Sequence, residues 1–270
     1  MISLKLSDKP KQYEQDWVEF YKLKFKVTPD VLIPRPETEL LVDEVLKFIH
    51  NREYSLSNSS SRSATFTILD IGTGAGNIAI SLAKNLILHP CWVIPGTSGD
   101  TKIIATDVSA KALKIAKQNA KLHGVLDKIQ FVKSNLLSAF SHSGGQRPIE
   151  STKDPIASAG TSFVALLQGD NLIIVTNLPY IPSERIPYLD PSVKDFEPHV
   201  ALDGGSDGFD LYRKLFSQIK QKGWNPKLIV GEIDYTQGDL AYSEAKKYFP
   251  EAEVKVKLDL SHKQRILLIQ

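Results

Sequence analysis

The sequence predicts an α/β protein with a doubly wound, mostly parallel sheet of seven strands. Three observations lead to this fold class. Short apolar runs rich in branched residues alternate with helical stretches, a glycine-rich turn follows one of the first runs, and polar residues follow several others. The carboxyl ends of parallel strands lie at one edge of such a sheet, where α/β folds bind their ligands.

Composition places the chain among ordinary globular proteins. Its 270 residues, 42% of them hydrophobic, are enough to bury a large core. Lysine and arginine (33) exceed aspartate and glutamate (31) by only two, so nucleic acid is not indicated as a partner. The single cysteine excludes an internal disulfide, and the six histidines lack the paired spacing of a metal site. Because no signal peptide or membrane span is recognisable, we expect a cytoplasmic protein.

The first predicted elements are a small hairpin and a helix. Apolar residues alternate with lysines over 17–31, which is typical of a hairpin. Two prolines keep residues 32–39 extended until a helix begins at Glu37, and the serine-rich residues 51–65 predict a loop or linker. We therefore expect an N-terminal extension with its hairpin over 1–36 and a main domain over 37–270, with insertions near 51–65, 89–101 and 141–163.

The main domain begins with a strand at 67–71, the glycine turn and a helix that ends near Leu88. Further strands are predicted at 102–107, 128–132, 172–176 and 227–232, and further helices at 109–122, 208–221 and 238–248. A terminal antiparallel pair, 252–258 with 265–269, completes the seven strands.

The glycine turn is typical of a nucleotide site. Gly72, Gly74 and Gly76 allow a sharp bend and a close ligand approach, while the following helix offers free N–H groups. The spacing G-x-G-x-G differs from the G-x-G-x-x-G of a dinucleotide site. The alternative is that these glycines only close a turn between strand and helix.

An acid ends the next strand, where nucleotide-binding α/β folds hold ribose hydroxyls. Asp107 lies 35 residues beyond Gly72, and the insertion at 89–101 accounts for the long offset. The alternative is that Asp107 caps the following helix. Asn135 follows the third strand, so it is expected at the same sheet edge.

The tetrapeptide Asn177-Leu178-Pro179-Tyr180 suits a planar amino group as substrate. The Asn177 side-chain oxygen and the Leu178 carbonyl could accept the two N–H bonds of an amide or exocyclic amine, with Tyr180 packed on its plane. No strong base is nearby, which fits transfer of an already activated group by positioning. The alternative is a polar turn after a strand.

These residues resemble the site of class I, Rossmann-like methyltransferases that modify amino groups. Residues 32–39 (LIPRPETE), 196–198 (FEP), 201–205 (ALDGG), Gly208, 232–238 and 259–265 are similar to the release-factor glutamine methyltransferases, the HemK/PrmC family. The resemblance implies S-adenosyl-L-methionine as cofactor. By this resemblance, the methionine end of the cofactor would contact Gly72, Thr73, Gly74, Ala75 and Gly76. Asp107 would bind the ribose, Asn135 and Leu136 would bind the adenine, and Asn177 would also contact the cofactor.

The resemblance further implies methyl transfer to the side-chain amide nitrogen of the glutamine in the Gly-Gly-Gln motif of a class I peptide chain release factor. Asn177, Leu178, Pro179 and Tyr180 would hold that glutamine. Arg35, Glu37, Glu39 and Glu197 are left out of the catalytic set, because charges beside prolines are most often solvated or locally paired.

Three positions depart from the family pattern. Asn135 stands where the family usually has Asp, Leu178 changes the usual N-P-P-Y, and residues 1–36 stand where the family carries an N-terminal helical domain. N-L-P-Y also occurs in ribosomal RNA adenine dimethyltransferases, so an adenine-amino methyltransferase acting on RNA or DNA is the alternative. A non-catalytic cofactor-binding protein is the third hypothesis. Gly144-Gly145-Gln146 repeats the substrate tripeptide within the insertion, which allows self-docking or automethylation as a further hypothesis.

Overall fold

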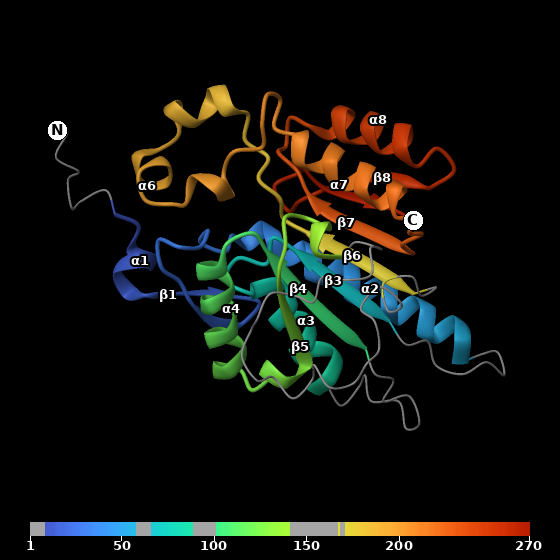
Figure 1. The fold of residues 1–270 in the computed structure, drawn as a ribbon, viewed down its shortest axis with the longest axis horizontal. Coiled ribbons are helices and arrows are strands. Elements are labelled where there is room, and N and C mark those ends of the chain that lie inside the picture. The colour runs from blue at the N-terminus through green and yellow to red at the C-terminus, as the bar shows by residue number, and fades with distance from the viewer. Residues whose placement is uncertain (1–8, 58–65, 89–100, 141–166, 168–170) are drawn as a thin grey trace.

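The computed structural model describes residues 9–57, 66–88, 101–140, 167 and 171–270 (Figure 1). Its central feature is the predicted sheet of seven strands. In spatial order these are β5 (Ile129–Lys133), β4 (Lys102–Asp107), β3 (Thr67–Ile71), β6 (Leu172–Thr176), β7 (Leu228–Glu232), β9 (Gln264–Ile269) and β8 (Val254–Leu258). The first five are parallel, and β9 runs antiparallel to both neighbours. The predicted fold class and the terminal antiparallel pair are confirmed.

Helices cover both faces of the sheet, as Figure 1 shows. One face packs α2 (Glu39–Ser57), α3 (Asn77–Leu88) and part of α4 (Ala110–Leu122) against one set of strand residues, among them Ile68 and Val175. The other face packs α7 (Asp210–Gln221) and α8 (Gly238–Tyr248) against the alternate residues, among them Leu69 and Ile174. Because side chains alternate along a strand, the two-sided burial explains why these strands are continuously apolar.

The predicted N-terminal hairpin is confirmed as β1 (Trp17–Phe20) and β2 (Leu23–Lys26), preceded by the short α1 (Lys11–Gln15). It packs on α4 through the buried Asn119. The Asn119 amide accepts from Lys26 N (2.7 Å) and donates to the carbonyls of Lys26 (3.0 Å) and Ala75 (2.8 Å). One side chain therefore joins the hairpin to the glycine turn.

Two boundaries differ from the prediction at the first long helix. It opens with a 3₁₀ turn, η2 (Pro36–Thr38), before α2 begins at Glu39. The loop expected from residue 51 is wrong for 51–57, which continue α2. Polarity suggested a loop there, but Arg and Glu are good helix formers and the helix is already nucleated by its buried N-terminal half.

The other elements agree with the prediction within one or two residues at each end. The exceptions are short turns that carry no periodic signal: η3 (Leu126–Lys128), η4 (Ser138–Phe140), η6 (Ser183–Tyr188), α6 (Pro191–Lys194) and η7 (His199–Ala201). The last three form a projection beside the sheet (Figure 1). Residues 58–65, 89–100 and 141–166, with most of the predicted insertions and the tripeptide 144–146, lie outside the described residues.

Strand register brings the polar strand ends to one edge. Ile71, the last residue of β3, is level with Thr106 of β4 and Thr176 of β6. Gly72, Asp107 and Asn177 each follow directly, so they lie side by side. The chain order reverses between β3 and β6, and this topological switch point is where open α/β sheets bind ligands.

Candidate functional site

The glycine turn leaves β3 in a backbone conformation that L-residues rarely adopt. Gly72 and Gly74 have φ values of 75° and 53°. A Cβ placed on Gly72 would lie 3.7 Å from Leu178 Cδ2 and 3.8 Å from the carbonyl oxygen of Asn177. The turn and the tetrapeptide at 177–180 therefore lie next to each other, and Gly72 itself is exposed.

Gly76 is a glycine for a different reason. With φ 83°, a Cβ there would lie 2.9 Å from Ile80 Cδ1 and 3.1 Å from Ala116 Cβ. The missing side chain lets α4 approach the turn closely. Packing accounts for Gly76, so the predicted cofactor contact at this position stays a prediction.

A buried acid lies beneath the turn and was absent from the predicted site residues. Asp70 Oδ2 accepts from Thr73 Oγ1 (2.7 Å) and Ala79 N (3.2 Å), whereas Oδ1 has no hydrogen-bond partner among the described residues. Burial raises the pKa of Asp70 to about 7. The signal available in the sequence was a single acid inside an apolar strand.

Asp107 closes the turn from the neighbouring strand. Its Oδ2 accepts from Gly74 N (2.9 Å) and its Oδ1 from Ser109 N (2.8 Å). Each oxygen retains a second acceptor position, so the carboxylate remains able to bind two hydroxyls. The alternative that Asp107 caps the helix is wrong, because Ser109 is the N-cap of α4 and its Oγ accepts from Ala112 N (3.2 Å).

The Asn135 and Leu136 pair forms the next part of the edge. Asn135 is exposed, and its Oδ1 accepts from Lys214 Nζ at 3.5 Å. Leu136 has a φ of 52°, unusual for a leucine, and its carbonyl accepts from Ser134 Oγ at 2.7 Å. The local backbone is thus held in a turn that presents the Asn135 side chain outward.

Asn177 is joined to two distant segments by a chain of hydrogen bonds. Its Nδ2 donates to Thr38 Oγ1 (3.1 Å), which donates to Glu232 Oε2 (2.6 Å). Tyr180 OH donates to the other oxygen, Oε1 (3.1 Å). Burial raises the pKa of Glu232, while the hydrogen bonds from Thr38 and Tyr180 lower it. Sequence reasoning missed Thr38, and it noted Glu232 only as part of a C-terminal pattern.

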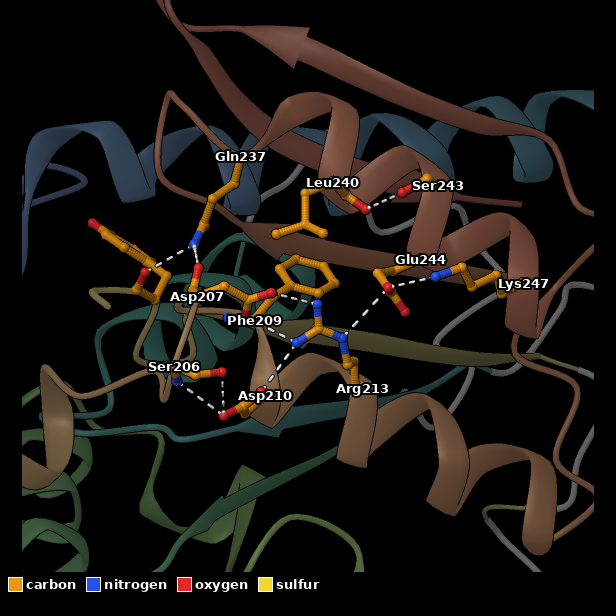
Figure 2. Close-up of polar contacts among 11 residues, drawn as sticks. Ser206, Asp207, Phe209, Asp210, Arg213, Gln237, Leu240, Ser243, Glu244 and Lys247 are labelled. Carbon is orange, nitrogen blue, oxygen red and sulfur yellow. Dashed lines mark hydrogen bonds and ion pairs between the residues drawn. The ribbon is translucent and has the colours of Figure 1, made fainter. Parts of the chain in front are cut away.

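The rest of the tetrapeptide is held by its backbone. The Leu178 side chain is buried in the core beside α7, so its main chain is what remains for a ligand. Gln237 Nε2 donates to the carbonyls of Tyr180 and Asp207, each at 3.0 Å (Figure 2). A Cβ on Gly208 would lie 2.1 Å from the Tyr180 oxygen, so only glycine fits there.

An ion-pair cluster around Arg213 holds the loop of residues 206–210, which contains Gly208 (Figure 2). Arg213 of α7 binds Asp207 (2.5 Å), Asp210 (3.0 Å) and Glu244 (3.5 Å). Glu244 of α8 also binds Lys247 at 2.8 Å. The cluster ties two helices to the loop whose Gly208 contacts the Tyr180 carbonyl.

The charged residues excluded from the catalytic set include three with partners nearby in the fold. Arg35 Nη2 lies 2.5 Å from Glu197 Oε1, and Glu39 Oε1 accepts from Tyr21 N at 2.7 Å. Local pairing, the expectation for such residues, is confirmed for these three charges. In the part of the chain that the structure describes, no three His, Cys, Asp or Glu side chains gather as metal ligands, and no helix is long and apolar enough to cross a membrane.

Comparisons with known proteins agree with this geometry. A family model described as "Methyltransferase domain" matches residues 62–144. The chain is 32% identical over 262 residues to a release factor glutamine methyltransferase of Bacillus cereus, covering 97% of this chain and 76% of that one. It is 30% identical over 265 residues to one of Enterococcus faecalis, covering 98% and 77%.

Solved structures add support for the fold. The hMettl16 catalytic domain in complex with MAT2A 3'UTR hairpin 6 is similar with a TM-score of 0.54 at 14% identity, over 93% of this chain and 76% of that one. The sheet, its switch-point turn and the domain match define a class I methyltransferase. Within that class, the chain belongs to the release factor glutamine methyltransferase family. The resemblance seen in the sequence is confirmed.

Proposed function

We propose that this protein transfers a methyl group from S-adenosylmethionine to the side-chain amide nitrogen of the glutamine in the Gly-Gly-Gln motif of a class I release factor. Family membership over nearly the whole chain is the observation that carries the proposal. The adenine-amino alternative is not favoured, since these curated relatives are named for glutamine.

The described residues fit the cofactor. Gly72 is exposed and Gly74 half-buried at the switch point, so their backbone is accessible to a ligand. Asp70 Oδ1 is a buried acceptor without a partner among the described residues, which suits an ammonium group. Asp107 retains acceptor capacity for the ribose hydroxyls, and Asn135 with Leu136 would hold the adenine. When bound, S-adenosylmethionine supplies a methyl group already activated on a sulfonium.

The tetrapeptide would orient the nucleophile. Because the Asn177 Nδ2 donates to Thr38, its Oδ1 is left to accept one N–H of the substrate amide, and the Leu178 carbonyl would accept the other. The nitrogen then forms its bond to the methyl carbon as the carbon–sulfur bond breaks, and one N–H proton leaves to solvent. The protein contributes position, since an amide nitrogen is a weak nucleophile.

Radiolabelled cofactor and a matched release factor test the proposal. We expect label on the glutamine of the Gly-Gly-Gln motif and none on a release factor with that glutamine replaced by alanine. Asn177→Ala should lower turnover far more than cofactor affinity. Label on RNA or DNA with none on the release factor would overturn the proposal in favour of the alternative.

A further inference from the structure

The orientation of the Asn177 amide decides what it can offer a substrate. An asparagine side chain has an acceptor on one side and a two-hydrogen donor on the other, and a 180° flip exchanges them at almost no steric cost. To hold an amide nitrogen that carries two hydrogens, the side facing the substrate must be the oxygen. A device that prevents the flip would therefore raise the fraction of molecules ready to react.

The structure contains such a device in Thr38 and Glu232. A hydroxyl has one hydrogen, and Thr38 directs it at Glu232 Oε2 over 2.6 Å. Thr38 Oγ1 is then able only to accept from its other neighbour. The Asn177 group that lies 3.1 Å away must accordingly be the Nδ2 donor.

The direction of this chain is set at Glu232, because an ionised carboxylate accepts and never donates. Its second oxygen accepts from Tyr180 OH at 3.1 Å. Burial raises the pKa of Glu232, and the hydrogen bonds from Thr38 and Tyr180 together with the positive charge of Arg265 oppose that shift and favour the ionised form. Both oxygens thus face donors, in a buried setting where hydrogen bonds to charge are strong.

We propose that Thr38 and Glu232 are positioning residues that fix the Asn177 amide with Oδ1 toward the substrate nitrogen. This rests on the proposed function. Neither residue touches the reacting atoms; they act through Asn177, from the end of η2 and the end of β7. Thr38, the threonine of LIPRPETE, thus has a positioning role that the residues next to it in sequence do not indicate.

Isosteric variants test the proposal with little change of shape. Thr38→Val removes the hydroxyl, Glu232→Gln allows the chain to run in either direction, and Thr38→Ser keeps the hydroxyl. As controls, Thr67→Val makes the same change in a buried strand residue, and Glu44→Gln neutralises an acid whose recorded ion pair is with Lys257. Thermal unfolding and cofactor binding by calorimetry are measured for every variant.

For Thr38→Val and Glu232→Gln we expect kcat on the release factor to fall ~10–100-fold, with the cofactor Kd within about 3-fold of the original protein. Thr38→Ser should restore most of the activity, and both controls should keep it. If Thr38→Val and Glu232→Gln retain full kcat while the protein methylates the release factor, the positioning proposal is overturned and the proposed function stands.

A second measurement does not depend on activity. The side-chain amide protons of Asn177, assigned by the peaks lost in Asn177→Ala, should exchange slowly with solvent in the original protein and quickly in Thr38→Val. If the release factor is not a substrate, the proposed function fails, and this exchange still decides the orientation. Equal exchange in the two proteins would overturn the positioning role.

Discussion

Arg35 Nη2 lies 2.5 Å from Glu197 Oε1, although 162 residues separate the two in sequence. The contact joins the segment before α2 to the projection that follows the tetrapeptide. The Glu197 side chain is only 1% exposed, and its Oε2 has no hydrogen-bond partner among the described residues. Burial raises the pKa of Glu197, while Arg35 opposes that shift. The carboxylate therefore depends on this one guanidinium.

Arg35→Gln should lower the free energy of unfolding by about 3 kcal/mol at pH 8, because it leaves a buried carboxylate without its cation. Lowering the pH should restore part of the loss, since Glu197 then takes up a proton. Urea unfolding at two pH values measures both effects. The double variant Arg35→Gln with Glu197→Gln is the control, and it should be more stable than the single one at pH 8. Equal stability of Arg35→Gln and the original protein would contradict this account.

The dependence of stability on pH should carry a contribution from Asp70. Burial raises its pKa to about 7, above its ordinary value of 3.8, so the folded state holds the proton more tightly than the unfolded state. The stabilisation is complete below the unfolded pKa and is lost as the pH rises through the folded one. Between pH 5 and pH 9 we expect this group alone to lower the free energy of unfolding by about 3 kcal/mol.

Asp70→Asn removes that titration while keeping an oxygen that can accept from Thr73. Urea unfolding from pH 5 to pH 9 should give a shallower decline for the variant than for the original protein. Other buried acids, such as Glu232, titrate in both proteins, so the difference between the curves isolates Asp70. Parallel curves would mean that Asp70 keeps an ordinary pKa.

Much of the fold was predictable because burial leaves a strong local signal. Strands such as β6 are buried on both faces and therefore appear in the sequence as unbroken apolar runs. The ends of β4 and β6 could be located from these runs, and with them the positions of Asp107 and Asn177. The continuation of α2 over 51–57 was not predictable from composition, because its serines and charged residues are compatible with a loop.

The hydrogen bonds that position Asn177 could not be predicted from the sequence, for a different reason. Thr38 and Glu232 lie 194 residues apart, and neither has a local partner that suggests the contact. The packing of α2 against β6 and β7 brings the preceding turn η2, and with it Thr38, to the end of β7 where Glu232 lies. Asp70 was visible as an acid in an apolar strand, but its unpartnered oxygen depends on how the turn folds over it.

The adenine end of the proposed cofactor site offers a gain-of-affinity variant. Asn135 is exposed, and among the described residues the hydrogen-bond partner of its Oδ1 is Lys214 Nζ at 3.5 Å. An aspartate there would accept the adenine amino hydrogen with a charged oxygen, which makes a stronger hydrogen bond. Asn135→Asp should tighten S-adenosylmethionine binding by about 1 kcal/mol, or about 5-fold, by calorimetry. Asn135→Ala should weaken binding, and unchanged affinity in both variants would place the adenine elsewhere.

Gly72 and Gly124 allow the strain of a turn to be separated from ligand contact. Their φ values are 75° and 68°, so alanine at either position costs ~1 kcal/mol of stability in the left-handed region. A Cβ on Gly124 meets nothing within 4 Å, whereas one on Gly72 would lie 3.8 Å from the carbonyl oxygen of Asn177, between the turn and the tetrapeptide. Gly72→Ala should weaken S-adenosylmethionine binding more than 10-fold, and Gly124→Ala should leave it unchanged at a similar loss of thermal stability. If both variants bind the cofactor equally well, the space beside Gly72 is not where it lies, and the glycine is required only by the turn.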